Sequence, residues 1–136
     1  MKKILALLAL TLSMASATVH AQVRNLDIGD IESFGDEFVG KTVRIVGKIS
    51  NTYSCTLASN RGYRCLKISN PKQRGKVEEA LIRDGAYRFE QYKDWMNDET
   101  LLAFTGTVEL RETVHLFRAD RSMTPALIVR RIEAAN

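Results

Sequence analysis

The amino-acid sequence predicts a small, mainly β domain with one or two helices. Three observations lead to this prediction. Residues 41–50, 101–110 and 125–134 are rich in β-branched and aliphatic side chains in the short runs that are typical of strands. The two cysteines flank a turn-like sequence, which indicates a hairpin. Helical spacing of apolar residues is found in residues 70–85 and 86–98. The predicted order is strand, hairpin, helix, strand, long loop and strand.

The first 21 residues have the pattern of a secretory signal peptide. Two lysines precede the apolar run Ile4–Met14, which has the length of a signal-peptide core and is too short to span a bilayer. Val19 and Ala21 are small residues at the positions that a signal peptidase requires. A buried amphipathic helix is the alternative, but it would need polar residues at helical spacing, and Leu5–Leu10 contains none. We therefore expect cleavage before Gln22 and a periplasmic or secreted protein. No later apolar run is long enough to cross a membrane, so stable membrane insertion is not expected.

The charge of the mature chain is nearly balanced overall but segregated along the sequence. Removing residues 1–21 leaves 115 residues, enough for one domain with a core, with 18 basic and 16 acidic side chains. Residues 22–40 form an acidic lead-in segment that we expect to be part of the domain. Residues 41–76 contain nine basic side chains and no acidic one. The high isoelectric point of the precursor therefore does not by itself indicate nucleic-acid binding.

The cysteine hairpin predicts a structural disulfide. Cys55 and Cys65 flank the sequence TLASNRGYR, and a turn at Ser59–Gly62 brings the two cysteines opposite each other. Disulfides form readily in an exported protein. A metal site is a weaker alternative, because zinc needs about four ligands. A redox dithiol is also weaker, because its cysteines usually stand two residues apart at the start of a helix. We expect the disulfide to hold the register of the hairpin.

The first half of the mature chain is predicted to contain a short lead-in element, a strand and a helix. In the lead-in, the residues spaced to form one apolar face of a short helix or turn are Ile28, Ile31, Phe34 and Phe38. The strand Lys41–Ser50 directs Val43, Ile45 and Ile49 to one face, and Gly47 marks a bulge or corner. Residues 70–85 are predicted to be a helix that Asn70 caps, that Pro71 begins and that Gly85 ends. The buried stripe of this helix is predicted to be Val77, Ala80 and Leu81.

The second half is predicted to contain another short helix and two final strands. The helix, within residues 86–98, is expected to bury Phe89, Tyr92 and either Trp95 or Met96. The strands are Leu101–Leu110 and Pro125–Ala134. Residues 111–124 between them are expected to form a loop too long for a tight hairpin, with an extra short strand near Leu116 and Phe117.

The segments GKTVRIVGKIS and FTGTVEL…ALIVRRIEA resemble the first strand and the last two strands of an OB-fold. The resemblance covers Gly40–Ala135 and is closest to small exported bacterial OB-fold proteins and anticodon-binding-like domains. It implies a five-stranded Greek-key barrel over residues 41–136, with a helix between strands three and four. In that fold the ligand face is formed by strands two and three and the loop between the last two strands.

The basic segment covers the strands of that implied ligand face. The predicted ligand-binding residues are Arg44, Arg61, Tyr63, Arg64 and Lys67. Tyr53 and Tyr63 would provide stacking surfaces beside the cations, which suits a single-stranded nucleic acid or an anionic sugar chain. The alternative is a solvated strand face whose cations pair with the acidic flanks.

The sequence contains no motif that predicts catalysis. It has no serine–histidine–aspartate spacing, phosphate-binding loop or metal motif, and His115 stands alone in a predicted loop. Asp94, Asp98 and Glu99 are adjacent acids that we expect to be solvated. We therefore predict no catalytic residue, no cofactor and no metal.

The predicted function is a non-enzymatic binding module for an envelope protein, peptidoglycan or another polyanion, with nucleic acid as a further possibility. The alternative is a protein-interaction or inhibitor domain that uses the cysteine hairpin as its contact element.

Overall fold

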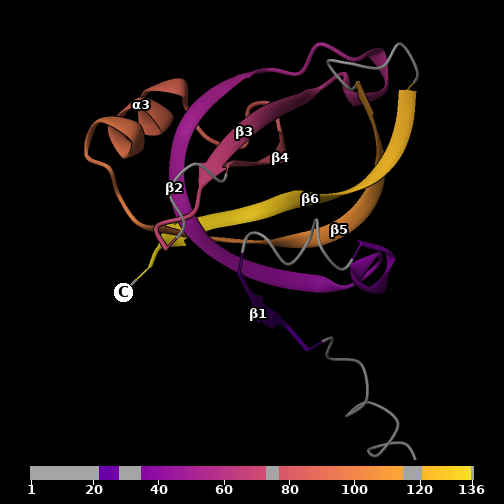
Figure 1. Cartoon of the computed structure of the whole chain (residues 1–136). Coiled ribbons are helices and arrows are strands. Elements are labelled where there is room, and N and C mark those ends of the chain that lie inside the picture. Colours follow the sequence, from indigo (N-terminus) through magenta and orange to yellow (C-terminus); the bar gives the residue numbers. More distant parts are fainter. Residues whose placement is uncertain (1–21, 28–34, 73–76, 115–120, 136) are drawn as a thin grey trace, which may run out of the picture.

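The part of the protein that the structure describes is a β-barrel with one α-helix and a short additional strand (Figure 1). The computed structural model describes residues 22–27, 35–72, 77–114 and 121–135. The predicted signal peptide therefore lies outside the described residues. The strands are β1 (Arg24–Leu26), β2 (Thr42–Ser54), β3 (Tyr63–Ser69), β4 (Val77–Arg83), β5 (Leu102–Val114) and β6 (Arg121–Ala134). The helical elements are the 3-10 turns η2 (Gly35–Phe38) and η3 (Ala58–Asn60) and the α-helix α3 (Phe89–Asn97).

The sheet closes on itself in the topology of an OB-fold. The strand order is β1-β2-β3-β4-β6-β5, and an additional pairing between β2 and β5 closes a five-stranded barrel. The pairing of β4 with β6 is parallel, while the other pairs of the barrel are antiparallel. The helix α3 follows the third barrel strand, β4, and precedes the fourth, β5. The predicted barrel and the place of its helix are confirmed, and β1, which pairs in parallel with β2, is an addition.

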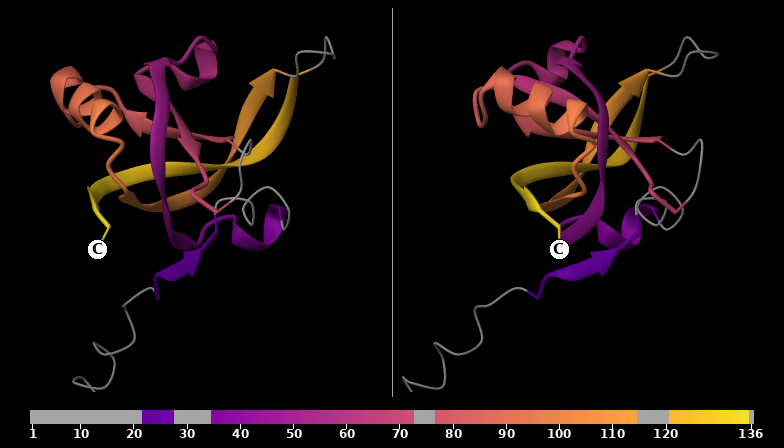
Figure 2. Two further views of the ribbon diagram at one scale, coloured as in Figure 1. Left: turned by 60° about the vertical axis from the view of Figure 1, so that its left-hand side comes forward. Right: turned by 90° about the vertical axis from the view of Figure 1, so that its left-hand side faces the viewer.

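The long strand β2 turns the corner that closes the barrel. Its first half, Thr42–Gly47, pairs with β5, and its second half, Lys48–Ser54, pairs with β3. The change of partner falls at Gly47, where the sequence predicts a bulge or corner. A register shift follows between Ile49 and Asn51. The predicted strand and the first arm of the cysteine hairpin are therefore one continuous, strongly bent strand (Figure 2).

The core fills the barrel and is covered at one end by α3. The alternation of β2 is confirmed, because Val43, Ile45 and Ile49 are buried. On α3, Tyr92 is buried and packs edge to face against Tyr87 and Trp95. The prediction for Phe89 is wrong: its side chain is 48% exposed. Phe89 is the first residue of α3, and its ring faces the Arg64 guanidinium instead of the core.

Residues 77–83 form strand β4, so the helix predicted over residues 70–85 is wrong. The middle of β4 lies between β3 and β6, and three consecutive residues, Ala80, Leu81 and Ile82, are buried. Such a run fits a strand with both faces covered as well as it fits a helical stripe. Val77, predicted to be buried, is exposed. The Asn70 side chain accepts a hydrogen bond from the Lys72 N–H at 2.9 Å, so it forms a local turn.

The last two strands form a longer hairpin than the sequence predicts. Their register continues to Val114 opposite Arg121, so most of the predicted loop is a strand ladder. Figure 2 shows β5 and β6 extending together past the rest of the barrel. His115 and the extra strand predicted near Leu116 and Phe117 lie outside the described residues. In the lead-in segment, Phe38 is buried as predicted, and the other three apolar positions lie outside the described residues.

Candidate binding face

The cysteine hairpin lies at one end of the barrel and is closed by a disulfide, as predicted. Cys55 directly follows β2, Cys65 lies in β3, and their Cα atoms are 5.2 Å apart. The turn between them contains η3 and then Gly62, whose φ of +87° suits a glycine. The Cys55 N–H donates a hydrogen bond to the Tyr63 carbonyl at 3.3 Å, which extends the pairing of β2 with β3 beyond the last strand residue.

A small apolar cluster lies on the outer face of the barrel beside the disulfide. We call it the outer cluster; it consists of the buried residues Leu81, Ala126 and Ile128, with Cys55 and Tyr63 packed against it. It lies outside because successive strand residues point to opposite faces, and the neighbours of these residues fill the barrel core. The outer cluster therefore gives this face an apolar floor.

One cation on this face is held by a tyrosine and a carboxylate. The Arg111 guanidinium lies over the Tyr63 ring, 4.8 Å from its centroid. Arg111 Nη2 donates hydrogen bonds to the Tyr63 hydroxyl at 3.3 Å and to Glu109 Oε2 at 3.0 Å. The Arg111 side chain is 20% exposed and that of Glu109 is 42% exposed. We call these three residues the Arg111 triad.

A second triad, which again consists of a cation, a tyrosine and a glutamate, lies on the strands β2, β3 and β4. Lys67 Nζ lies over the Tyr53 ring, 5.9 Å from its centroid, and the Tyr53 hydroxyl donates to Glu79 Oε2 at 3.0 Å. Lys67 also stands directly opposite Glu79 in the register of β3 and β4. Burial, followed by the hydrogen bond and the charge of Glu79, raises the pKa of Tyr53 to about 12. On β3, Cys65 lies between Tyr63 of the first triad and Lys67 of the second, and it stands opposite Tyr53 of β2. The disulfide therefore lies between the two triads.

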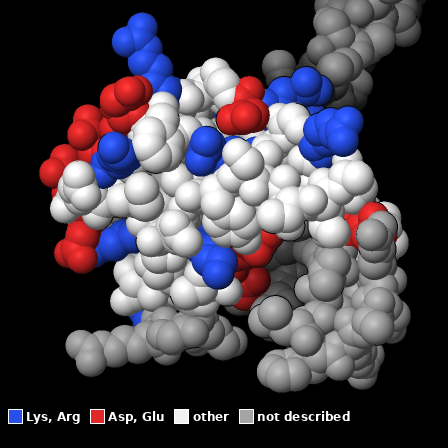
Figure 3. Space-filling view, turned by 90° about the horizontal axis from the view of Figure 1, so that it is seen from above, with Lys and Arg blue, Asp and Glu red and all other residues white. Residues whose placement is uncertain are grey.

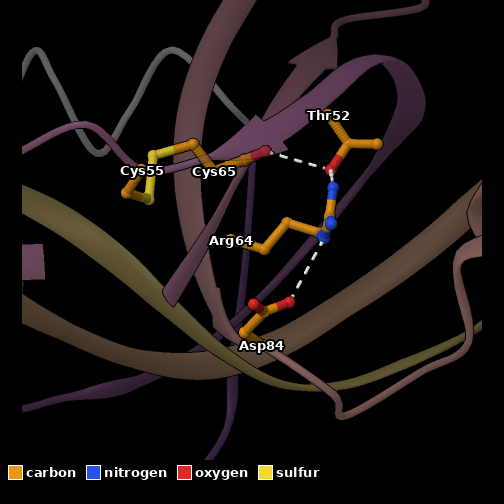
Figure 4. A network of polar contacts seen from close by, with 5 residues as sticks. All are labelled: Thr52, Cys55, Arg64, Cys65 and Asp84. Carbon is orange, nitrogen blue, oxygen red and sulfur yellow. Dashed lines mark hydrogen bonds and ion pairs between the residues drawn. A yellow bond between two sulfur atoms is a disulfide. The ribbon is translucent and has the colours of Figure 1, made fainter. Parts of the chain in front are cut away.

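Arg64 points to the opposite side of β3 and has several partners in the protein. Its Nη1 donates to Thr52 Oγ1 at 3.3 Å, and its Nε lies 3.7 Å from the Asp84 carboxylate (Figure 4). The guanidinium also lies over the Phe89 and Tyr92 rings at 5.5 and 5.6 Å. Only 16% of the side chain is exposed. Arg64 therefore joins the hairpin to α3, while its role in binding stays a prediction.

The remaining predicted residues are spread over the barrel. Arg44 lies on the outer side of β2, opposite Asn25 of β1 and Thr105 of β5. Arg61 is exposed in the turn after η3. Of the predicted set, the structure brings only Tyr63 and Lys67 to the outer face of β3, on either side of Cys65. Arg111, Glu109 and Glu79 were not predicted as site residues: Arg111 lies in the predicted loop, and the two acids lie outside the basic segment.

Acidic partners from several elements compensate the cations of the basic segment. Figure 3, a view from above, shows acidic side chains gathered mainly at the left edge, on the side where Figure 1 places α3, and basic side chains scattered over the whole view, some of them beside these acids. Within the described part of the lead-in segment, the Asp27 carboxylate lies 3.9 Å from Lys72 Nζ. Both side chains are largely exposed, so this pair contributes only about 0–1 kcal/mol. Two further acids near the basic segment, among the described residues, are Glu79 of β4, which stands opposite Lys67, and Asp84, the residue after β4, which lies near Arg64.

The described residues show neither a cluster for a metal ion nor a membrane-spanning helix. Within those ranges, no three His, Cys, Asp or Glu side chains are grouped so that they could hold a metal. No helix found in the same ranges combines the length and the apolar character needed to cross a bilayer.

Comparisons with known proteins support the fold. No protein family and no curated protein matches the sequence. An aspartyl-tRNA synthetase from Leishmania major Friedlin is structurally similar, with a TM-score of 0.52 and 16% identity, over 86% of this chain and 21% of the synthetase. An OBody bound to hen egg-white lysozyme is similar with a TM-score of 0.50 and 14% identity, over 83% of this chain and 95% of the OBody. At such low identity the likeness extends to the fold alone.

Proposed function

We propose that this chain is an exported, non-enzymatic OB-fold module that binds an anionic ligand of the cell envelope on the face that carries the two triads. The observation that carries the proposal is the Arg111 triad. A guanidinium with little exposure is held above an aromatic ring beside an apolar floor. In such partly desolvated surroundings a charge-assisted hydrogen bond is stronger than one in water.

The position of the triads within the fold supports the same proposal. In OB-folds, ligands bind across the second and third barrel strands and the loops beside them. Here those strands are β3 and β4, which carry Tyr63, Lys67 and Glu79. The disulfide holds the neighbouring turn. Two cations fixed over tyrosine rings are preorganised, so less side-chain entropy is lost when an anion binds.

The binding test compares variants of the two triads on heparin and on a single-stranded oligonucleotide. We expect Arg111→Gln and Lys67→Gln to weaken retention and the double variant to abolish it. Arg131→Gln is the matched control, because Arg131 is an exposed arginine in an ion pair on β6. Added salt should weaken retention of the wild type, as expected for a polyanion. Unchanged retention of the double variant would exclude this face as the site.

Export is supported by the signal-like leader and is compatible with the disulfide. Intact mass spectrometry of material from the cell envelope tests both features. We expect a chain that starts at Gln22 and is lighter than the reduced form by two hydrogen atoms. A full-length mass with two free thiols would exclude both processing and oxidation.

A second candidate function is a protein-interaction or inhibitor domain. The observation that favours it is the apolar surface of the hairpin formed by β5 and β6, where Leu110 and Met123 are exposed. An apolar protein interface depends much less on salt than polyanion binding does. Complex formation that persists in high salt and is lost in Leu110→Ser would favour this function over the first.

A further inference from the structure

The Arg111 triad already holds a carboxylate where a ligand carboxylate would bind. Glu109 Oε2 accepts a hydrogen bond from Arg111 Nη2 at 3.0 Å, on the face that we propose as the binding site. Within the described residues, the hydrogen bonds found for Arg111 all use Nη2. A planar guanidinium binds a carboxylate through two parallel N–H groups, and each such pair includes an N–H group of Nη2. A carboxylate that binds Arg111 in this way must therefore replace Glu109 or Tyr63 at Nη2.

A second ion pair with the same spacing shows how the Arg111 triad differs from an ordinary surface pair. Arg131 and Glu133 also stand two residues apart on one strand, at 3.3 Å. The Arg131 side chain is 65% exposed, and no ring contact of Arg131 is found among the described residues. Arg111 is much less exposed and lies over a tyrosine, which fixes the direction of its N–H groups. The pair on β6 is therefore a matched control with the same charges.

The surroundings of the tyrosines indicate which class of ligand fits. Tyr63 packs on the outer cluster and carries the Arg111 guanidinium over its ring. Tyr53 carries Lys67 over its ring, and its hydroxyl is bound to Glu79. Nucleic-acid bases need exposed ring faces for stacking, and a cation of the same chain lies over one face of each of these rings. What the face presents is directed N–H groups, and the charged acceptor that they hold in the free protein is a carboxylate, that of Glu109.

Resting on the proposed function, we propose that Arg111 is the carboxylate-binding residue of this face, that the ligand is an acidic polypeptide, and that Glu109 competes with it. In the free protein the Glu109 carboxylate is an internal stand-in for the ligand group. Its negative charge also repels an arriving carboxylate. Binding is weaker than the site allows as long as Glu109 stays on Arg111. Loss of the Glu109 charge makes the site bind acidic peptides more tightly.

The test measures binding of a fluorescent oligoglutamate peptide by anisotropy at low and moderate salt. We expect Glu109→Gln to increase affinity about tenfold, in the range typical of coupled interactions. Glu133→Gln removes the same charge elsewhere and should change affinity by less than about twofold. Arg111→Gln should reduce affinity at least about tenfold, and the Glu109→Gln/Arg111→Gln double variant should bind as weakly as Arg111→Gln alone. Melting curves of each variant verify that the fold is retained.

Each outcome distinguishes this inference from the proposed function. If the wild type binds the peptide and Glu109→Gln gains no more than Glu133→Gln, the competition is excluded and the proposed function stands. If a heparin fragment or an oligonucleotide of equal charge binds more tightly than the peptide, the polypeptide ligand is excluded. If neither the wild type nor any variant binds any of the three probes, both the inference and the proposed function are wrong.

Discussion

At the scale of single residues, Gly106 is a position where the closed barrel leaves no room for a side chain. It lies on β5 at the register shift against β6, next to Thr105. A Cβ atom on Gly106 would lie 2.9 Å from the Val129 Cα and still closer to the Ile128 carbonyl oxygen. These are backbone atoms of the facing strand, so they cannot move aside as the end of a flexible side chain would.

We therefore expect Gly106→Ala to destabilise the protein by about 3 kcal/mol or more, because overpacking against backbone forces the two strands apart. Urea denaturation measures the difference. The control is Thr107→Val at a half-exposed position on the same strand, where the two side chains have nearly the same shape. Its free energy of unfolding should stay within about 0.5 kcal/mol of the wild-type value. A Gly106→Ala protein as stable as the control would show that β5 and β6 are less closely packed than the structure indicates.

At the scale of elements, strands with one buried face could be predicted from sequence, and the strand with two buried faces could not. β2 alternates because its outer side is partly solvated. The consecutive buried residues Ala80, Leu81 and Ile82 show no such alternation, because β3 and β6 flank them and the outer cluster covers Leu81. Helical spacing is then an equally good description of the same residues. Deciding between the two requires knowledge of the neighbouring strands, which the local sequence does not contain.

The same limit applies to the candidate site. The cysteine pairing could be predicted because both partners lie in one hairpin. Tyr63 and Lys67 could be placed by strand alternation. Arg111 could not, because its contact with Tyr63 joins residues 48 positions apart and depends on the register of the last hairpin. Charge runs along a sequence also do not show which acids will lie beside them after folding.

The disulfide is expected to stabilise the hairpin without determining the fold. Cys55 and Cys65 are ten residues apart, and the ladder between β2 and β3 continues from Ser54 opposite Arg64 to Lys48 opposite Ser69. We expect Cys55→Ala with Cys65→Ala to lower the free energy of unfolding by about 2–3 kcal/mol and to leave the circular dichroism spectrum unchanged. Alanine is preferable to serine because Cys65 is buried, and a serine at this position would bury a hydroxyl group. The reduced wild type should unfold at nearly the same urea concentration as the double variant. A double variant that does not fold would mean that the disulfide is needed to form the barrel.

At the scale of the whole molecule, folding brings together charges that the sequence keeps apart. The basic segment contains no acid, yet Arg64 lies near Asp84 and Lys67 lies opposite Glu79. Both acids come from β4 or the residue after it, which lies beside β3 in the barrel. The residues of β4 and the residue after it therefore bring carboxylates close to two cations of the basic segment. If this face binds a ligand as proposed, we expect the orientation of its cations to matter more than the number of cations along the sequence.

Two tyrosines make the stability of the whole barrel sensitive to alkaline pH. The pKa of Tyr92 is raised to about 12, chiefly by burial, against an opposing effect of the nearby Arg64 charge. The pKa of Tyr53 is also raised to about 12. In the unfolded chain both hydroxyls ionise near pH 10. Between about pH 10 and pH 12 the unfolded state loses these protons while the folded state retains them, so the free energy of unfolding falls as pH rises. Below about pH 10 the contribution is fully present.

We therefore expect the free energy of unfolding of Tyr92→Phe to depend less on pH in this window. The slope of this free energy against pH should decrease by an amount that corresponds to at most one proton. Urea denaturation at pH 8, 10, 10.5 and 11 measures the slope, and the difference between variant and wild type removes the contributions of lysines, which titrate in the same range.

Tyr53→Phe should reduce the slope in the same way, but it also removes the hydrogen bond to Glu79 and so should lower stability at neutral pH. Tyr92→Phe should not, because within the described residues the buried Tyr92 hydroxyl has no hydrogen-bond partner. Removing an unpartnered hydroxyl from a core relieves its desolvation penalty, so stability at pH 8 should stay equal or rise. An unchanged slope in Tyr92→Phe, or a loss of stability at pH 8, would show that this hydroxyl has a partner in the folded protein and that the end of the barrel beneath α3 is wetter than its burial indicates.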